Sequence, residues 1–93
     1  MADFILFKFE TDEESKNRDL SISRETTIRE ALNSFLRSTN SIMTLDLEKI
    51  QFMNKVKLLN TPKILDKKVG AHFNRSTQNV KIKVLDAGNI LGG

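Results

Sequence analysis

The chain has 93 residues, which is enough for one domain and too few for two hydrophobic cores. Leu, Ile, Val and Phe supply 29 of them, so we expect a folded domain rather than a disordered chain. The lack of Cys and the single His, His72, exclude disulfides, thiol nucleophiles and Cys/His zinc sites. The formal charge of +3 is uneven: residues 1–48 carry a net −4 and residues 49–93 a net +7, so an acidic partner would meet the second half.

The sequence also bears on membranes, nucleic acids and location. No stretch approaches the roughly 20 apolar residues that cross a bilayer, and the N-terminus lacks the basic-then-apolar layout of a secretion signal. We therefore expect a soluble protein of the cytoplasm and/or nucleus, with no membrane partner. Tyr and Trp are absent, so any base-stacking surface would consist of Phe alone, and nucleic acid is not an expected partner.

The first two elements predict a β-hairpin. Residues 4–9 are β-branched and aromatic and are too short for a helix. Residues 18–23 alternate between polar and apolar, which places Leu20 and Ile22 on a buried face. The acidic residues 10–17 between them are expected to form a mobile, solvated hairpin loop without a catalytic role.

A helix is expected next. Thr27 and Glu30 match the capping box, in which the cap hydroxyl and the Glu side chain each satisfy a free backbone amide. Polar residues 38–41 end the helix. Its apolar positions fall three and four residues apart and form one stripe, made of Ile28, Ala31, Leu32, Phe35 and Leu36.

The second half predicts shorter elements around one clear strand. Residues 49–53 and 56–59 form a strand pair around a turn at Asn54-Lys55, after an ambiguous connector over 42–47. A helical turn is expected within 64–69, followed by a polar connection over 70–79 in which His72 and Phe73 have no assigned place. The last strand, 80–84, alternates throughout and buries Val80, Ile82 and Val84.

These elements predict an α+β fold. One helix crosses one face of a mixed sheet of four to five strands, and the first and last strands lie side by side in parallel. Residues 1–85 form the domain, and residues 86–93 form a flexible tail with nothing to hold it on the core.

Few patterns in the chain carry catalytic chemistry. No phosphate-binding loop, nucleophile motif or metal-ligand spacing is present, so we expect no enzyme activity, no metal and no cofactor. The terminal Gly92-Gly93 is more informative, because a carboxylate without neighbouring side chains can enter a narrow acylating active site.

In this order, the elements resemble ubiquitin and the β-grasp modifiers over almost the whole chain. The similar segments are residues 22–28, Lys49 to Lys55, Leu65-Asp66, Val80 to Val84 and the diglycine. The resemblance implies a monomer whose Gly93 is adenylated with ATP, passed to a cysteine as a thioester and joined to a substrate lysine.

The same resemblance implies a set of partners. These are activating, conjugating and deconjugating enzymes and substrate proteins, with Ile90 and Leu91 recognised in the tail. Release from a longer, polyubiquitin-like precursor is also implied, and Lys8 and Lys55 resemble chain-forming lysines.

The chain departs from ubiquitin at the apolar patch that receptors bind. The aligned positions read Gln51, Lys81 and Lys83, which with Lys49 form an expected basic partner surface, so receptors for the ubiquitin patch should bind poorly. Phe4 and Leu6 share the strand face opposite Ile5 and Phe7, and one of these pairs could form a substitute docking patch.

Two other functions remain open. The chain could be a ubiquitin-like interaction domain that is never conjugated and that binds through its basic sheet face. It could also be a sulfur carrier, in which the tail of a related β-grasp protein becomes a thiocarboxylate.

Overall fold

The computed structural model describes residues 3–39 and 50–86, and no helix in this part of the chain is long and apolar enough to cross a membrane. The expected connector over 42–47 and residues 87–93 of the expected tail lie outside the described residues. Asp86, the first residue of the expected tail, instead ends the last strand, where it pairs with Ile50. The elements follow in the order β1 (Phe4–Glu10), the 3-10 turn η1 (Glu14–Lys16), β2 (Arg18–Ser23), α1 (Ile28–Ser38), β3 (Ile50–Asn54), β4 (Lys57–Leu58), α2 (Pro62–Leu65), α3 (Val69–His72) and β5 (Asn79–Asp86).

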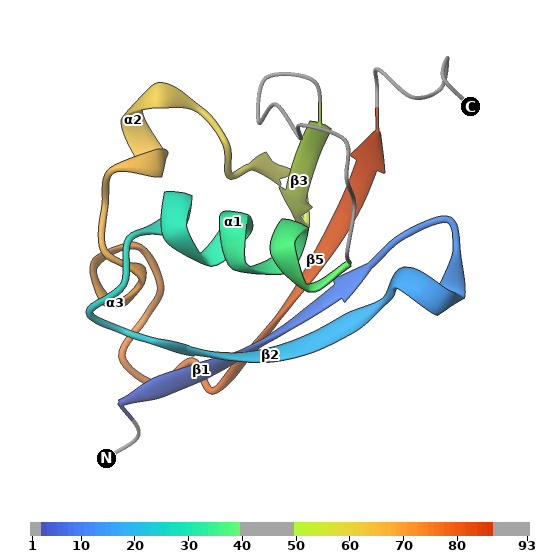
Figure 1. Ribbon diagram of the computed structural model, residues 1–93. Coiled ribbons are helices and arrows are strands. Elements are labelled where there is room, and N and C mark those ends of the chain that lie inside the picture. The colour runs from blue at the N-terminus through green and yellow to red at the C-terminus, as the bar shows by residue number, and fades with distance from the viewer. Residues whose placement is uncertain (1–2, 40–49, 87–93) are drawn as a thin grey trace.

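The five strands form one mixed sheet in the order β2-β1-β5-β3-β4 (Figure 1). β1 and β5 pair in parallel, with Phe7 opposite Val80, whereas the other three pairs are antiparallel. Parallel neighbours require a long crossover, which the chain from β2 to α3 supplies. The predicted hairpin and the predicted parallel pairing of the first and last strands are both confirmed.

α1 lies across one face of this sheet and begins where the sequence predicts (Figure 1). Thr27 is its N-cap, and the Thr27 hydroxyl accepts a hydrogen bond from the Glu30 backbone amide at 3.2 Å. The predicted apolar stripe is the buried face, since each of its five residues is at most 7% exposed. A helix of 11 residues is marginal alone, so its stability comes from this packing against the sheet.

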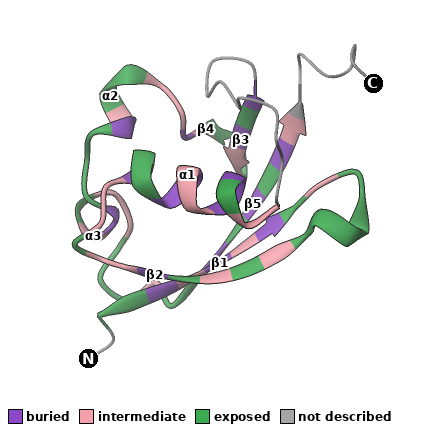
Figure 2. Ribbon diagram, viewed as in Figure 1, coloured by how far each residue is buried: buried purple, intermediate pink, exposed green. Residues whose placement is uncertain are grey.

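Phenylalanine rings fill the layer between α1 and the sheet, where Figure 2 shows the buried parts of the ribbon in purple. Phe9 stacks on Phe35 with ring centroids 4.5 Å apart, and both meet Phe52 edge-on at 6.3 and 6.0 Å. Phe7 lies 5.8 Å from Phe9 and meets Phe73 edge-on at 5.7 Å. The rings thereby join β1, β3, α1 and the residues after α3 in one cluster.

Backbone hydrogen bonds tie the residues around α3 to the segment before α1. The amide of Val69 donates to the Thr26 carbonyl at 2.8 Å, and the amide of Gly70 donates to the Arg24 carbonyl at 2.9 Å. The Arg24 guanidinium donates in turn to the carbonyls of Arg75 and Thr77, at 3.1 and 2.6 Å. The connection into β5 is therefore held against the start of the helix.

This connection differs from the prediction at two places. α2 starts at Pro62 rather than near Ile64, because proline has the φ angle of a first helical position and no amide that would need a partner there. The expected polar connection over 70–79 begins with α3 instead. With four residues, α3 is too short to show a periodic pattern, although its first residue, Val69, is fully buried.

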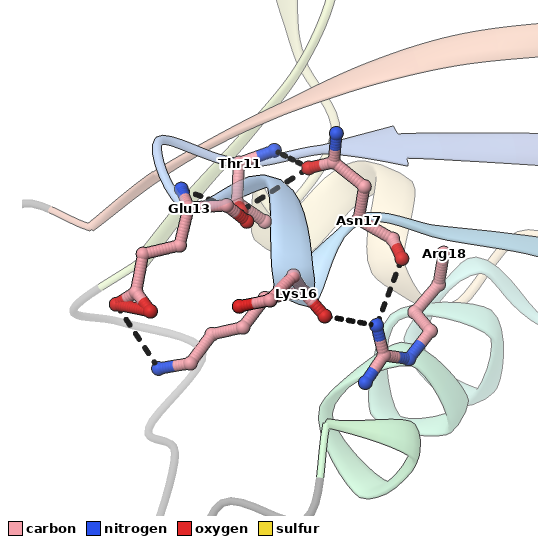
Figure 3. Close-up of polar contacts among 6 residues, drawn as sticks. Thr11, Glu13, Lys16, Asn17 and Arg18 are labelled. Carbon is pink, nitrogen blue, oxygen red and sulfur yellow. Dashed lines mark hydrogen bonds and ion pairs between the residues drawn. The ribbon is translucent and has the colours of Figure 1, made fainter.

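The acidic loop between β1 and β2 has its own polar network (Figure 3). The Thr11 amide donates to Asn17 Oδ1 at 2.7 Å, and the Thr11 hydroxyl donates to the Glu13 carbonyl at 2.6 Å. Lys16 Nζ lies 3.6 Å from the Glu13 carboxylate, and the Arg18 guanidinium donates to two loop carbonyls at 2.7 and 2.8 Å. The side chains of residues 12–14 are exposed, as expected of a solvated surface.

Substitution of Gly70 tests the close contact around α3. A Cβ at this position would lie 3.0 Å from Arg24 Cβ and 3.1 Å from the Arg24 carbonyl oxygen, which already accepts the Gly70 amide. Within a helix, alanine is normally more stable than glycine by about 1 kcal/mol. A loss of stability in Gly70→Ala would therefore be due to the contact between the added Cβ and Arg24. We expect Gly70→Ala to lower the free energy of unfolding in urea by about 1–3 kcal/mol.

The matched control for this prediction is Ala71→Ser, at the exposed neighbouring position of α3. We expect it to change the free energy of unfolding by less than about 0.5 kcal/mol. An unchanged or increased stability of Gly70→Ala would show that the helix can move away from Arg24, contrary to the prediction.

Candidate functional site

The sheet face opposite α1 carries most of the described residues that the sequence singles out. Along β1, β5 and residues 50–53 of β3, every second side chain points away from the helix, and these side chains are exposed or half-buried whereas their neighbours are buried. We call this surface the outer face, and it includes Lys8, Glu10, Gln51, Met53, Lys81, Lys83 and Leu85.

The structure brings three of the four expected partner-binding residues together on the outer face. Gln51, Lys81 and Lys83 are exposed. In the register of β3 and β5, Gln51 lies opposite Leu85, two residues from Lys83. Lys49 lies outside the described residues. The use of this surface for binding stays a prediction.

The outer face is less uniformly positive than the sequence suggests. Glu10 Oε2 lies 3.8 Å from Lys81 Nζ, and Asp19 lies opposite Lys8 in the β1–β2 register. The Glu10–Lys81 pair is exposed, so it contributes at most about 1 kcal/mol to stability. Its carboxylate nevertheless reduces the positive charge next to Lys81. The parallel pairing of β1 with β5 brings this acidic side chain of the first half against the basic second half.

A depression of about 610 Å³ lies beside the turn between β3 and β4, and it is lined by outer-face side chains together with side chains on the helix side of the sheet. Its lining combines the lysines Lys81 and Lys83 with Met53, Leu85 and Phe73. The three apolar residues were not among the expected site residues. The period-two pattern that places Gln51 outward also places Met53 outward, so Met53 could have been found from the sequence. Phe73 could not, because it follows a helix that the sequence does not reveal.

The apolar alternative patch is only partly formed. Ile5 and Phe7 are buried, so Phe4 and Leu6 are the pair that points outward. Phe4 is 53% exposed and Leu6 is half-buried. One exposed phenylalanine is a small surface, and single exposed apolar side chains are common on soluble proteins.

The two possible chain lysines differ in accessibility. Lys55 is exposed in the turn after β3, where its φ of 60° falls in the left-handed region. Lys8 is half-buried within β1 and lies opposite Asp19 on one side and Lys81 on the other. The Lys55 amine is therefore the more open to acylation. The four tail residues with an expected role, Ile90, Leu91, Gly92 and Gly93, lie outside the described residues.

His72 and Phe73, which the sequence could not place, lie at the end of α3. The two rings meet edge-on with centroids 4.8 Å apart, and Phe73 packs against the core. Burial lowers the pKa of His72 below its usual value, and the charges of Lys67 and Lys57 lower that pKa further. Within residues 3–39 and 50–86, no cluster of His, Cys, Asp and Glu could hold a metal ion.

Comparison with known proteins identifies the fold. No protein-family model matches the sequence, and no curated protein matches it. One similar structure was solved in work on molecular mimicry of SUMO, which promotes DNA repair. The superposition covers 91% of this chain and 94% of that protein, with a TM-score of 0.66 and 12% sequence identity. A second similar structure is that of a protein of Arabidopsis thaliana, solved from evolutionary couplings and sparse NMR data. The superposition covers 91% of this chain and 88% of that protein, with a TM-score of 0.63 and 13% sequence identity.

At these identities the likeness concerns the fold alone. Taken with the five-stranded mixed sheet and the helix packed across it, it confirms the expected α+β fold of the β-grasp type.

Lys55 gives a test of backbone strain in the turn. A side chain at a positive φ costs about 1–2 kcal/mol, which glycine avoids. Glycine also makes the unfolded chain more flexible, and this offsets part of the gain. We expect Lys55→Gly to raise the free energy of unfolding by about 0.5–1 kcal/mol in urea denaturation. Lys55→Ala removes the same charge but keeps the strain, so an equal gain in both variants would disprove the explanation.

The lowered pKa of His72 predicts a pH dependence of stability. The unfolded chain takes up a proton on His72 at a higher pH than the folded chain does, so stability declines as the pH falls through about 6.5. We expect the free energy of unfolding to fall more between pH 7.5 and pH 5 in the unmodified protein than in His72→Gln. Equal losses over that interval would show that His72 protonates equally easily in both states.

Proposed function

We propose that this protein is a ubiquitin-like modifier, activated at the Gly93 carboxylate and conjugated to lysines of target proteins. One combination of features supports the proposal: a β-grasp domain whose last strand, β5, is followed in the sequence by Gly92-Gly93. Glycine has no Cβ, so this end can pass through a narrow channel to a reacting centre.

The proposed chemistry transfers the C-terminal acyl group in three steps. The Gly93 carboxylate attacks the α-phosphate of ATP, forming an acyl-adenylate and releasing pyrophosphate. A cysteine thiolate of an activating enzyme then displaces AMP, and the amine of a substrate lysine finally displaces the thiolate to form an isopeptide bond. The partner enzymes supply every catalytic group, so the proposed role requires no enzyme activity or cofactor of this chain.

The surface chemistry narrows the proposed partners. Where ubiquitin presents an apolar patch, the outer face presents Gln51, Lys81 and Lys83. Enzymes and receptors that bury the ubiquitin patch would desolvate the two lysine charges without supplying an acidic partner. We therefore propose dedicated activating, conjugating and deconjugating enzymes, in the cytoplasm and/or nucleus, that recognise a monomer through Ile90, Leu91 and the diglycine. The structural likeness to a protein solved in work on molecular mimicry of SUMO supports the β-grasp fold on which this proposal rests.

An ATP-dependent thioester assay tests the proposal. The tagged chain and a matched variant lacking Gly93 are incubated with ATP in lysate of the source cells, and products are separated on gels with and without reducing agent. We expect reducing-agent-sensitive adducts, followed by stable ones, from the intact chain only. The variant keeps the whole β-grasp domain, so a difference between the two reports on the tail.

The assay needs ubiquitin as its positive control. If ubiquitin forms thioesters in the same lysate and the intact chain forms none, conjugation through Gly93 is wrong. The remaining interpretation would then be an interaction domain that is never conjugated. Mass spectrometry of the chain isolated from cells would show separately whether Gly93 is its terminal residue there.

A further inference from the structure

One part of the central strand β5 has a neighbour on a single side. β5 extends from Asn79 to Asp86, but its pairing with β3 covers only residues 83–86, ending at Met53 opposite Lys83. Residues 79–82 pair with β1 on the other side. Within the described chain, no strand residue pairs with residues 79–82 on the side that faces the turn between β3 and β4. Asn54, the last residue of β3, falls opposite Ile82 in the register, and no strand residue lies beside Asn79, Val80 or Lys81 on that side.

The register of the parallel pair shows which backbone groups face this open side. The Leu6 amide donates to the Gln78 carbonyl at 2.9 Å, and Leu6 lies opposite Asn79. In a parallel ladder, alternate residues bond to opposite neighbours, so Val80 bonds toward β1. The amides and carbonyls of Asn79 and Lys81 then point to the open side. The Asn54 side chain reaches the Lys81 carbonyl from that side, at 3.1 Å.

Side chains of two kinds flank the open stretch. Lys81 is exposed on the outer face, Lys55 is exposed in the turn after β3, and both line the depression described above. On the opposite face, Val80 is buried and Phe73 is half-buried, and both line the same depression. Three lysines (Lys55, Lys81 and Lys83) and one carboxylate (Glu10) line the depression, so its polar part has a net positive charge, whereas its lining on the helix side of the sheet is apolar.

We propose that the open side of β5 at residues 79–82 binds an extended partner segment as an added short strand, with acidic and apolar side chains alternating along that segment. Strand addition uses main-chain hydrogen bonds for affinity and alternate side chains for selection. Acidic side chains of the added strand lie beside Lys55 and Lys81, and its apolar side chains lie beside Val80 and Phe73.

The open stretch accommodates only a short segment. Four residues of β-strand span about 13 Å, so about four residues of a partner segment can lie alongside it. Contacts of this size bind weakly, so the interaction fits a transient partner. The site uses no tail residue, and the proposal is therefore independent of conjugation through Gly93.

A synthetic peptide tests the proposal on the full chain. The probe is a fluorescent, end-capped peptide of seven residues that alternates Glu and Val and starts with Glu. The first control has the same composition with the Glu residues and the Val residues in separate blocks. The second control is the alternating peptide with every second backbone amide methylated, which removes the donors that would pair with β5. Affinities come from fluorescence anisotropy, and the bound site comes from NMR hydrogen exchange.

We expect the alternating peptide to bind at least about tenfold more tightly than either control, because each control loses main-chain pairing or the match to both faces. Exchange of the Asn79 and Lys81 amides should slow in the complex. Lys81→Gln should weaken binding about threefold to tenfold, whereas Lys63→Gln, at an exposed lysine on α2 outside the depression, should leave it unchanged.

Three results would overturn the proposal. Equal binding of all three peptides would mean charge attraction without strand addition, and no detectable binding would mean that the stretch accepts no such strand. Unchanged exchange at Asn79 and Lys81 in a formed complex would place the peptide elsewhere. Circular dichroism of both lysine variants excludes unfolding as the cause. The same titrations on the chain lacking Gly93 should give the same affinities, which separates this result from the outcome of the thioester assay.

Discussion

The parallel ladder between β1 and β5 holds the two ends of the described chain together in the middle of the sheet. Phe7 and Phe9 lie on its buried side opposite Val80 and Ile82, and all four are at most 6% exposed. Three elements add directly to this pair: β2 and β3 extend the sheet outward, and α1 covers the buried side. The ladder joins residues far apart in sequence, so the chain must close a long loop before the core can form.

The sequence predicts those parts of the fold whose residues repeat with a clear period. Alternation along 18–23 and 80–84, and the stripe that starts at Ile28, identify β2, β5 and α1 because each element buries one face. α3 cannot be recognised in this way, because its four residues complete barely one turn. It is stabilised by hydrogen bonds to Arg24 and Thr26, contacts that no local pattern encodes.

The candidate site likewise has features that the sequence predicts and features that depend on tertiary structure. Alternation alone places Lys81, Lys83 and Gln51 on one face, but the approach of Glu10 to Lys81 depends on which strands are neighbours. The open stretch of β5 is less predictable still, since it results from β3 ending its pairing at Met53. The sequence of a single strand shows which of its faces is polar. Where a strand lacks a paired neighbour depends instead on how the strands pair in the folded sheet.

The direction of the β1–β5 ladder also has a mechanical consequence. Because the two strands run in parallel, the start of β1 and the end of β5 lie at opposite ends of the sheet (Figure 1). A pulling force applied at Phe4 and Asp86 would act along the strands and load the hydrogen bonds between them in shear. All five paired positions would then resist together instead of opening one after another as in a hairpin pulled from its ends. The domain should therefore unfold only at high force when it is pulled between these two residues.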